Sequence, residues 1–166
     1  GIPWRPCGLG TGTLARIEGA QPGRTILLRG DIDALSVNEE TGLPYASEVP
    51  GVMHACGHDC HISMLLTAAM IVNEIRDRLK GTIVFAFQPA EELGLGARAM
   101  IEEGALEGVD ACFGMHVWSD YPAGTVALRK GPMMASGDQF KIHVRGKSTH
   151  GCLLYTSDAA DDLIGV

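Results

Sequence analysis

One unbroken apolar run, residues 82–87 (TIVFAF), constrains the fold of this chain more than any other segment. Its length and its β-branched and aromatic composition are typical of a strand that is buried on both faces of a parallel sheet. Apolar residues recur at spacings of three and four over residues 59–79, which predicts an amphipathic helix before this strand. A second helix is predicted over residues 96–103. Because strands that alternate with helices build parallel sheets, we expect an α/β fold with a mixed, mostly parallel sheet flanked by helices.

Three further segments have the composition of strands. Residues 13–18 (TLARIE) and 25–30 (TILLRG) are predicted to be strands joined by a turn at 19–23. Residues 110–117 (DACFGMHV) are predicted to form another buried strand. Gly81 is expected to end the helix that precedes the run at 82–87.

The sequence pattern changes after Gly131-Pro132. Residues 139–145 (QFKIHVR) alternate polar and apolar, as a half-exposed antiparallel strand does. We therefore divide the chain into a first domain over residues 1–131 and the start of a second domain over residues 132–151.

Acidic and imidazole side chains follow the carboxyl ends of three predicted strands. They are, in chain order, Asp31, Asp33, Glu91, Glu92 and His116. In open α/β sheets that edge is where ligands bind. Scattered surface charges would not sort in this way, so the pattern predicts a functional site at the edge.

The eight residues 54–61 (HACGHDCH) contain three histidines, two cysteines and an aspartate. A structural zinc knot would show a second closely spaced ligand pair, which this sequence lacks. The total of five cysteines is odd, and we expect them to be reduced thiols. The spacing of Cys56 and His58 does not share a helix face, so both side chains can point the same way only from loop or extended backbone. A functional metal site is therefore favoured over a packing accident.

Four side chains are predicted to hold metal: Cys56, His58, Glu92 and His116. A thiolate, two imidazoles and a carboxylate suit zinc, manganese or a similar divalent ion such as cobalt or nickel. Two such ions would polarise a carbonyl group and activate a water molecule. Glu91 would then be free to accept the proton of that water and deliver it to a leaving amine. Asp33 and Asp59 are expected to orient the ligating imidazoles.

Composition excludes several classes of partner. The 166 residues carry a formal charge of −7, which argues against nucleic acid and anionic membranes. No apolar run approaches the roughly 18 residues of a membrane span. No leader-like segment opens the chain, so we expect a cytoplasmic protein.

Five motifs resemble the amidohydrolase branch of the dinuclear metallopeptidases, whose wider family includes the aminoacylases and the carboxypeptidase-G-like enzymes. The motifs are RGDIDAL (29–35), MHACGHDCHISMLL (53–66), FQPAEE (87–92), GMHVW (114–118) and GKSTHG (146–151). The branch includes hippurate hydrolase, N-acyl-amino-acid amidohydrolases, N-acetyldiaminopimelate deacetylase and plant indole-acetyl-amino-acid hydrolases. The motifs occur in the order and with the spacings of that family, and as a set they are highly specific.

The resemblance implies a zinc-exopeptidase-like fold, with Cys56 shared between two ions and Glu91 as general base and acid. It also implies that His150 comes from a lid domain and contacts the carbonyl oxygen or the carboxylate of the substrate, commonly across a homodimer. The family supplies a further histidine ligand and most of the lid from later segments, so the chain is interpreted as a central fragment that is itself inactive. Residues 152–166 resemble an in-frame translation of a sequencing adapter, and we expect them to be non-native. Without their three Asp residues the formal charge is −4.

The predicted function is metal-dependent hydrolysis of the amide bond in N-acyl amino acids or similar small amides. One alternative is a non-catalytic metal-binding or regulatory relative. Another is a thiol hydrolase with Cys56 as its nucleophile.

Overall fold

The computed structural model describes residues 1–138 and 140–146. Residues 1–123 form one compact unit, which contains every described helix and strand. The elements, in chain order, are β1 (Trp4–Pro6), β2 (Thr13–Glu18), β3 (Gln21–Asp31), α1 (His58–Glu74), the 3-10 helix η1 (Arg76–Arg78), β4 (Lys80–Gln88), α2 (Gly96–Glu102) and β5 (Ala111–Gly114). The strand β1 was not predicted, because its three residues are too few to show a periodicity and its last residue is Pro6.

The five strands make one sheet in the order β1-β2-β4-β3-β5. The strand β3 pairs in parallel with β4 and β5, whereas β2 pairs antiparallel with β1 and β4. The predicted mixed α/β sheet is therefore confirmed. Although β2 and β3 are joined by a short turn, they are not neighbours, because β4 lies between them.

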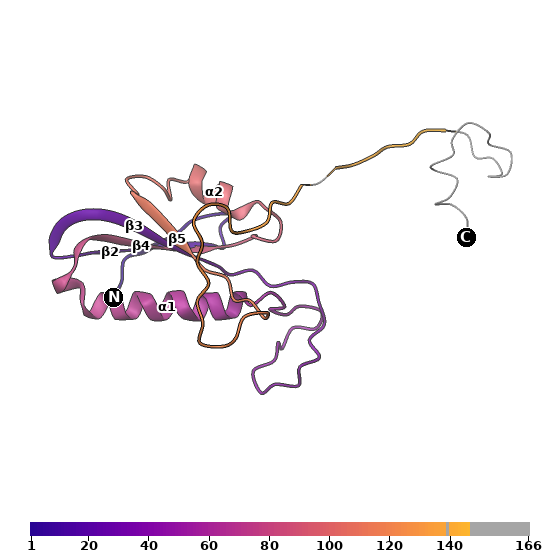
Figure 1. Ribbon diagram of the computed structural model, residues 1–166, viewed down its shortest axis with the longest axis horizontal. Coiled ribbons are helices and arrows are strands. Elements are labelled where there is room, and N and C mark those ends of the chain that lie inside the picture. The colour runs from indigo at the N-terminus through magenta and orange to yellow at the C-terminus, as the bar shows by residue number, and fades with distance from the viewer. Residues whose placement is uncertain (139, 147–166) are drawn as a thin grey trace. The chain divides into compact units, whose positions relative to one another are not determined.

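Strand β4 places successive side chains on opposite faces of the sheet, and each face has its own helix (Figure 1). Phe85, which is fully buried, packs with Leu65 and Ala69 of α1 on one face. Val84 packs with Met100 of α2 on the other face. The sequence pattern TIVFAF is thus buried on both sides, as its unbroken apolar character predicted.

Three predicted elements differ from the structure within the first unit. The strand β3 begins at Gln21, so the turn predicted over residues 19–23 was wrong for residues 21–23. The helix α1 ends at Glu74 and is followed by η1, so the predicted end near residue 79 was wrong, and Gly81 lies within β4. The strand β5 is exposed along its whole length, with Phe113 61% exposed, so the prediction of a buried strand was also wrong. Because β5 is the last strand in the sheet order, it has a neighbour on one side, and apolar composition alone cannot reveal this.

Residues 124–138 and 140–146 belong to a second unit and contain no helix or strand. The antiparallel strand predicted over 139–145 is therefore absent from residues 140–145, where Phe140, Ile142 and Val144 are exposed. An alternating pattern forms a strand only when another strand pairs with it. His150 and the predicted adapter-derived segment 152–166 lie outside the described residues. No helix in the described part of the chain is long and apolar enough to cross a membrane.

Candidate metal centre

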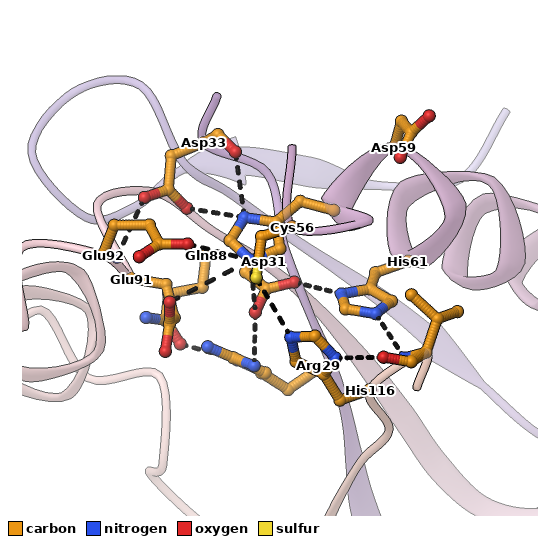
Figure 2. Close-up of polar contacts among 12 residues, drawn as sticks. Arg29, Asp31, Asp33, Cys56, Asp59, His61, Gln88, Glu91, Glu92 and His116 are labelled. Carbon is orange, nitrogen blue, oxygen red and sulfur yellow. Dashed lines mark hydrogen bonds and ion pairs between the residues drawn. The ribbon is translucent and has the colours of Figure 1, made fainter. Parts of the chain in front are cut away.

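The carboxyl ends of β3, β4 and β5 lie at one edge of the sheet, because these three strands run parallel. The chain leaves this edge through the segments that carry Asp33, Glu91 and His116, and α1 begins beside it at His58. Figure 2 shows that the side chains of Asp33, Glu91 and His116 converge on one small region with that of Cys56. The side chains that the sheet-edge rule singled out are thus gathered at one edge, and a functional site there stays a prediction.

His58 is buried, with 1% of its side chain exposed, and its ring has a defined orientation. Its Nδ1 lies 2.9 Å from the backbone carbonyl oxygen of Asp33, so Nδ1 donates and the lone pair is on Nε2. That Nε2 is buried and has no hydrogen-bond partner among the described residues. It lies 3.9 Å from Glu92 Oε1 and 4.0 Å from Glu91 Oε2. Since a buried unpaired nitrogen is unfavourable, this atom is suited to a cation.

Asp33 connects His58 to the loop that carries the two glutamates. Its carbonyl oxygen accepts the hydrogen bond from His58, while its carboxylate Oδ2 accepts one from the backbone N–H of Glu92 at 3.1 Å. The second carboxylate oxygen, Oδ1, lies 3.3 Å from His58 Nδ1. Asp33 thus contacts the predicted ligand His58 mainly through its backbone carbonyl oxygen, and its carboxylate lies close by.

Cys56 and His116 are the two other predicted ligands beside His58 and Glu92. The Cys56 Sγ and the His116 Nε2 are 3.5 Å apart. His116 Nδ1 donates to the carbonyl oxygen of Val117 at 2.6 Å, so its Nε2 lone pair points toward the thiol. Burial, a hydrogen bond with Glu92 and the negative charges nearby all raise the pKa of the Cys56 thiol. A divalent ion would therefore have to displace its proton.

The sequence analysis placed Asp31 at the sheet edge but gave no role to His61, and the structure joins the two. Asp31 is fully buried, and its carboxylate accepts a hydrogen bond from His61 Nδ1 and another from Arg29 Nη1 at 2.8 Å. Burial alone would raise the pKa of Asp31, but the His61 hydrogen bond and the Arg29 charge hold it below its ordinary value. His61 lies three residues after His58, so both occupy one face of α1. That spacing was the available signal.

Asp59 is the predicted residue that the structure does not bring into the cluster. It is exposed on the first turn of α1, and Figure 2 shows its carboxylate pointing away from the other side chains. As the immediate neighbour of His58 in a helix, it lies on a different helix face.

The loop after β4 holds the two glutamates in a tight conformation. Ala90 has a positive φ of 50°, which is unfavourable for a residue with a Cβ atom. Its carbonyl oxygen accepts hydrogen bonds from the backbone N–H groups of Leu95 and Gly96, both at 3.2 Å. A Cβ atom on Gly96 would lie 1.5 Å from the carbonyl oxygen of Pro89, so glycine is required there. Glu91 and Glu92 thus lie in a loop whose two ends are joined by backbone hydrogen bonds.

Within residues 1–138 and 140–146, three groups of side chains bring their donor atoms within 4.8 Å of one another, and all three include His58. They are Cys56, His58 and His116; His58, Glu91 and Glu92; and Asp31, His58 and His61. The first two groups combine sulfur, nitrogen and oxygen donors, which fits zinc or manganese. In the third group Asp31 and His61 are hydrogen-bonded to each other, so each already has a partner without a metal ion. The residues present therefore fit a metal centre that includes His58.

The fold and the site define an α/β protein with a candidate metal centre at the carboxyl edge of its sheet. A model of the peptidase family M20/M25/M40 matches residues 27–161, and the chain belongs to this family. The matched range extends into the segment predicted to be non-native.

Known relatives agree with this assignment. The chain is 50% identical over 165 residues to an N-acetyl-L-cysteine deacetylase of Bacillus subtilis, covering 99% of this chain and 39% of that protein. It is 47% identical over 144 residues to an N-acyl-L-amino acid amidohydrolase of Geobacillus stearothermophilus, covering 86% of this chain and 39% of that protein. The crystal structure of the Bacillus subtilis YXEP protein, described as a dinuclear metal binding peptidase from the M20 family, is 49% identical. Its TM-score is 0.76, with 79% of this chain and 37% of that chain covered.

The chain spans 39% of the length of both curated relatives. The activity of the whole protein is therefore a proposal.

Proposed function

We propose that the full-length protein hydrolyses the amide bond of N-acyl amino acids or similar small amides. The proposed centre holds two divalent ions on Cys56, His58, Glu92 and His116. One observation carries this proposal. Among the described residues the buried Nε2 of His58 has no hydrogen-bond partner. It faces two adjacent carboxylates, Glu91 and Glu92, at 4.0 and 3.9 Å, while Oδ2 of the buried Asp31 lies 3.6 Å away. One carboxylate can serve as a ligand while the other remains free to carry a proton.

We propose Glu91 as the general base and acid because its side chain is the more exposed of the two, at 40% against 32% for Glu92. The backbone N–H of Glu92 is in addition bonded to the Asp33 carboxylate. In the proposed reaction Glu91 takes a proton from the attacking water, whose oxygen bonds to the carbonyl carbon. Glu91 then gives this proton to the amine nitrogen as the carbon–nitrogen bond breaks. The ions, when bound, supply the charge that lowers the pKa of the water and polarises the carbonyl group.

A cavity of about 420 Å³ has room for a small amide and is lined in part by the predicted ligand Glu92, whereas Glu91 is not among its lining residues. Asp33, Pro89, Glu92 and Leu93 are among its lining residues. Its lining therefore includes two carboxylates, those of Asp33 and Glu92, together with apolar side chains. A lining of this kind suits a substrate that joins an amide group to a small apolar group.

The names of two relatives support the substrate class, because N-acetyl-L-cysteine deacetylase and N-acyl-L-amino acid amidohydrolase both refer to N-acylated amino acids. From the sequence resemblance we also propose His150 as a substrate contact, zinc or manganese as the native ion, and a homodimer formed through the lid domain. A location in the cytoplasm stays a prediction.

The direction of the pKa shift at Cys56 disfavours the thiol hydrolase alternative, whereas the 3.5 Å between its Sγ and His116 Nε2 is compatible with it. A nucleophilic cysteine needs a lowered pKa, whereas burial and the nearby carboxylates raise the pKa of this thiol. A thiol enzyme should also keep its activity after dialysis against a chelator. We expect the full-length protein to lose activity on chelation and to regain it when zinc or manganese is restored. Activity that survives complete metal removal would support the thiol mechanism.

The decisive variant is Glu91→Gln, which keeps the shape of the side chain and removes the base. Turnover of a panel of N-acyl amino acids should fall by about 10²–10⁴-fold. Metal content, measured by elemental analysis, should stay unchanged because Glu91 is not proposed as a ligand.

The matched control is Glu74→Gln, at an exposed glutamate on the last turn of α1, which should leave turnover unchanged. A Glu91→Gln protein that loses metal would show that the two glutamates have exchanged roles. A Glu91→Gln protein with full turnover would favour the non-catalytic or thiol alternatives.

A further inference from the structure

His61 is buried on the first turns of α1, and both of its ring nitrogens are engaged. Its Nδ1 donates to the carboxylate of Asp31. Its Nε2 accepts a hydrogen bond from the backbone N–H of Val117 at 2.9 Å. Since one nitrogen donates and the other accepts, these two bonds define a single tautomer of a neutral ring.

The backbone of Val117 connects His61 to a predicted ligand. The N–H of Val117 donates to His61, while its carbonyl oxygen accepts the hydrogen bond from His116 Nδ1 at 2.6 Å. The His61 and His116 rings are also in edge contact, with centroids 4.6 Å apart and an interplanar angle of 74°. The position and the tautomer of His116 therefore depend on a residue that His61 holds in place.

The other end of this connection is anchored in the core. Asp31 is the last residue of β3, is fully buried, and also binds Arg29. A Cβ atom on Gly30 would lie 3.3 Å from the carbonyl oxygen of His61, so the glycine allows α1 to pack closely on β3. His61 thus joins a rigid strand end to the exposed segment that follows β5.

We propose that His61 is a positioning residue that sets the orientation of His116 through the backbone of Val117. This inference rests on the proposed function, because it assumes that His116 is a metal ligand. The strand β5 is exposed along its whole length and cannot by itself fix the segment that follows it. The bond from Val117 N–H to His61 supplies the missing constraint.

Two substitutions separate the two bonds of His61. In His61→Asn the amide nitrogen occupies the place of Nδ1, so it can donate to Asp31 but ends short of Val117. In His61→Gln the longer side chain places its amide oxygen near the position of Nε2, so it can accept from Val117 but no longer satisfies Asp31. Each variant therefore removes one of the two hydrogen bonds of His61, and both new side chains end in an amide group.

The experiment titrates the metal-free full-length protein and its variants with Co²⁺ and follows the cobalt absorption bands. We expect two cobalt ions in the original protein, and in His61→Asn an affinity for one of them lowered by about 10–100-fold. His61→Gln should bind cobalt as the original protein does. His61→Gln should therefore bind cobalt more tightly than His61→Asn. In thermal unfolding without metal the order of the two variants should reverse. His61→Asn should be the more stable one, because it still donates a hydrogen bond to the buried Asp31 carboxylate. A purely structural role would give the same order in both measurements.

The double variant His61→Asn/His116→Ala tests whether the effect passes through His116. It should bind cobalt no more weakly than His116→Ala alone, because His116 is then already absent. His143→Asn is the control, since His143 is exposed and lies in the second unit. An original protein that binds no cobalt would contradict the proposed function. An original protein that binds two ions, with His61→Asn binding them equally well, would contradict this inference alone.

Discussion

The two imidazoles of the site, His58 and His116, are placed in different ways. His58 is buried where α1 begins, and its ring bonds to a carbonyl group just beyond a central strand. His116 follows the exposed edge strand β5, and its ring bonds to its own chain neighbour, Val117. The core thus positions one predicted ligand directly, whereas the other depends on a contact from α1. The comparison indicates that the order of a site at a sheet edge depends on how firmly its most exposed strand is held.

The largest effect on stability is expected from Asp31→Ala, because Asp31 lies near His58 and also bonds to His61, which contacts the segment of His116. Its carboxylate bonds to His61 and Arg29, and its Oδ2 lies 3.6 Å from His58 Nε2. Removing one member of a buried ion pair costs about 3–5 kcal/mol, and we expect about 3 kcal/mol because Arg29 is partly exposed. Urea unfolding without metal measures this loss. The exposed carboxylate of Asp59 provides the control, and Asp59→Ala should change the free energy of unfolding by less than about 0.5 kcal/mol.

A smaller effect is expected from Gly57→Ala, which tests the His116 side of the comparison. Gly57 has a φ of 86°, and a Cβ atom there would lie 2.3 Å from Cγ2 of Val117. Gly10 has a similar φ of 75°, and a Cβ atom there would have nothing within 4 Å. Gly10→Ala therefore measures the backbone cost alone, about 1–2 kcal/mol.

Gly57→Ala should cost about 1 kcal/mol more than Gly10→Ala, because the side chain of Val117 must move. It should also weaken cobalt binding, which Gly10→Ala should not. Equal losses in the free energy of unfolding for the two variants would show that the contact with Val117 does not contribute to the cost of Gly57→Ala.

The smallest effect is a dependence of stability on pH. The pKa of Asp31 in the folded protein lies below its ordinary value, so the folded state binds the proton of this carboxyl group less readily than the unfolded state does. The resulting stabilisation is fully present above about pH 4, the ordinary pKa of aspartate, and is lost as the pH falls through the folded-state value.

Urea unfolding of the metal-free protein between neutral and acidic pH measures this loss. In Asp31→Asn the part of the acid dependence that comes from Asp31 should disappear. Asp59→Asn should retain it. An unchanged pH profile in Asp31→Asn would contradict the assignment.

Much of the fold was predictable because its signals are local. The run TIVFAF and the three-and-four periodicity of α1 each specify an element without reference to the rest of the chain. The order of the strands was not predictable, since β4 inserts between two strands that are adjacent in the sequence. The burial of β5 and the strand at 139–145 were predicted incorrectly for the same reason. Both depend on which neighbours cover or pair with the segment.

The site was predictable to the extent that it follows from the sheet-edge rule. Asp33, Glu91 and Glu92 were found because they directly follow strands. The role of His61 was not found, because it depends on a hydrogen bond to Val117, which is 56 residues away in the sequence. Two histidines at i and i+3 on one helix look equivalent in the sequence, and only their distant partners separate a predicted ligand from a positioning residue.

The closed loop after β4 also limits how the sequence can change in evolution or in the laboratory. Because the carbonyl group of Ala90 accepts hydrogen bonds from both Leu95 and Gly96, the number of residues between these points is set by the geometry of the closure. Insertions and deletions here would open the loop and move both glutamates together, even when every chemically reactive residue is retained. Leu93, in contrast, is 72% exposed within the same loop. Variation should therefore accumulate as substitutions at such positions and not as changes in loop length.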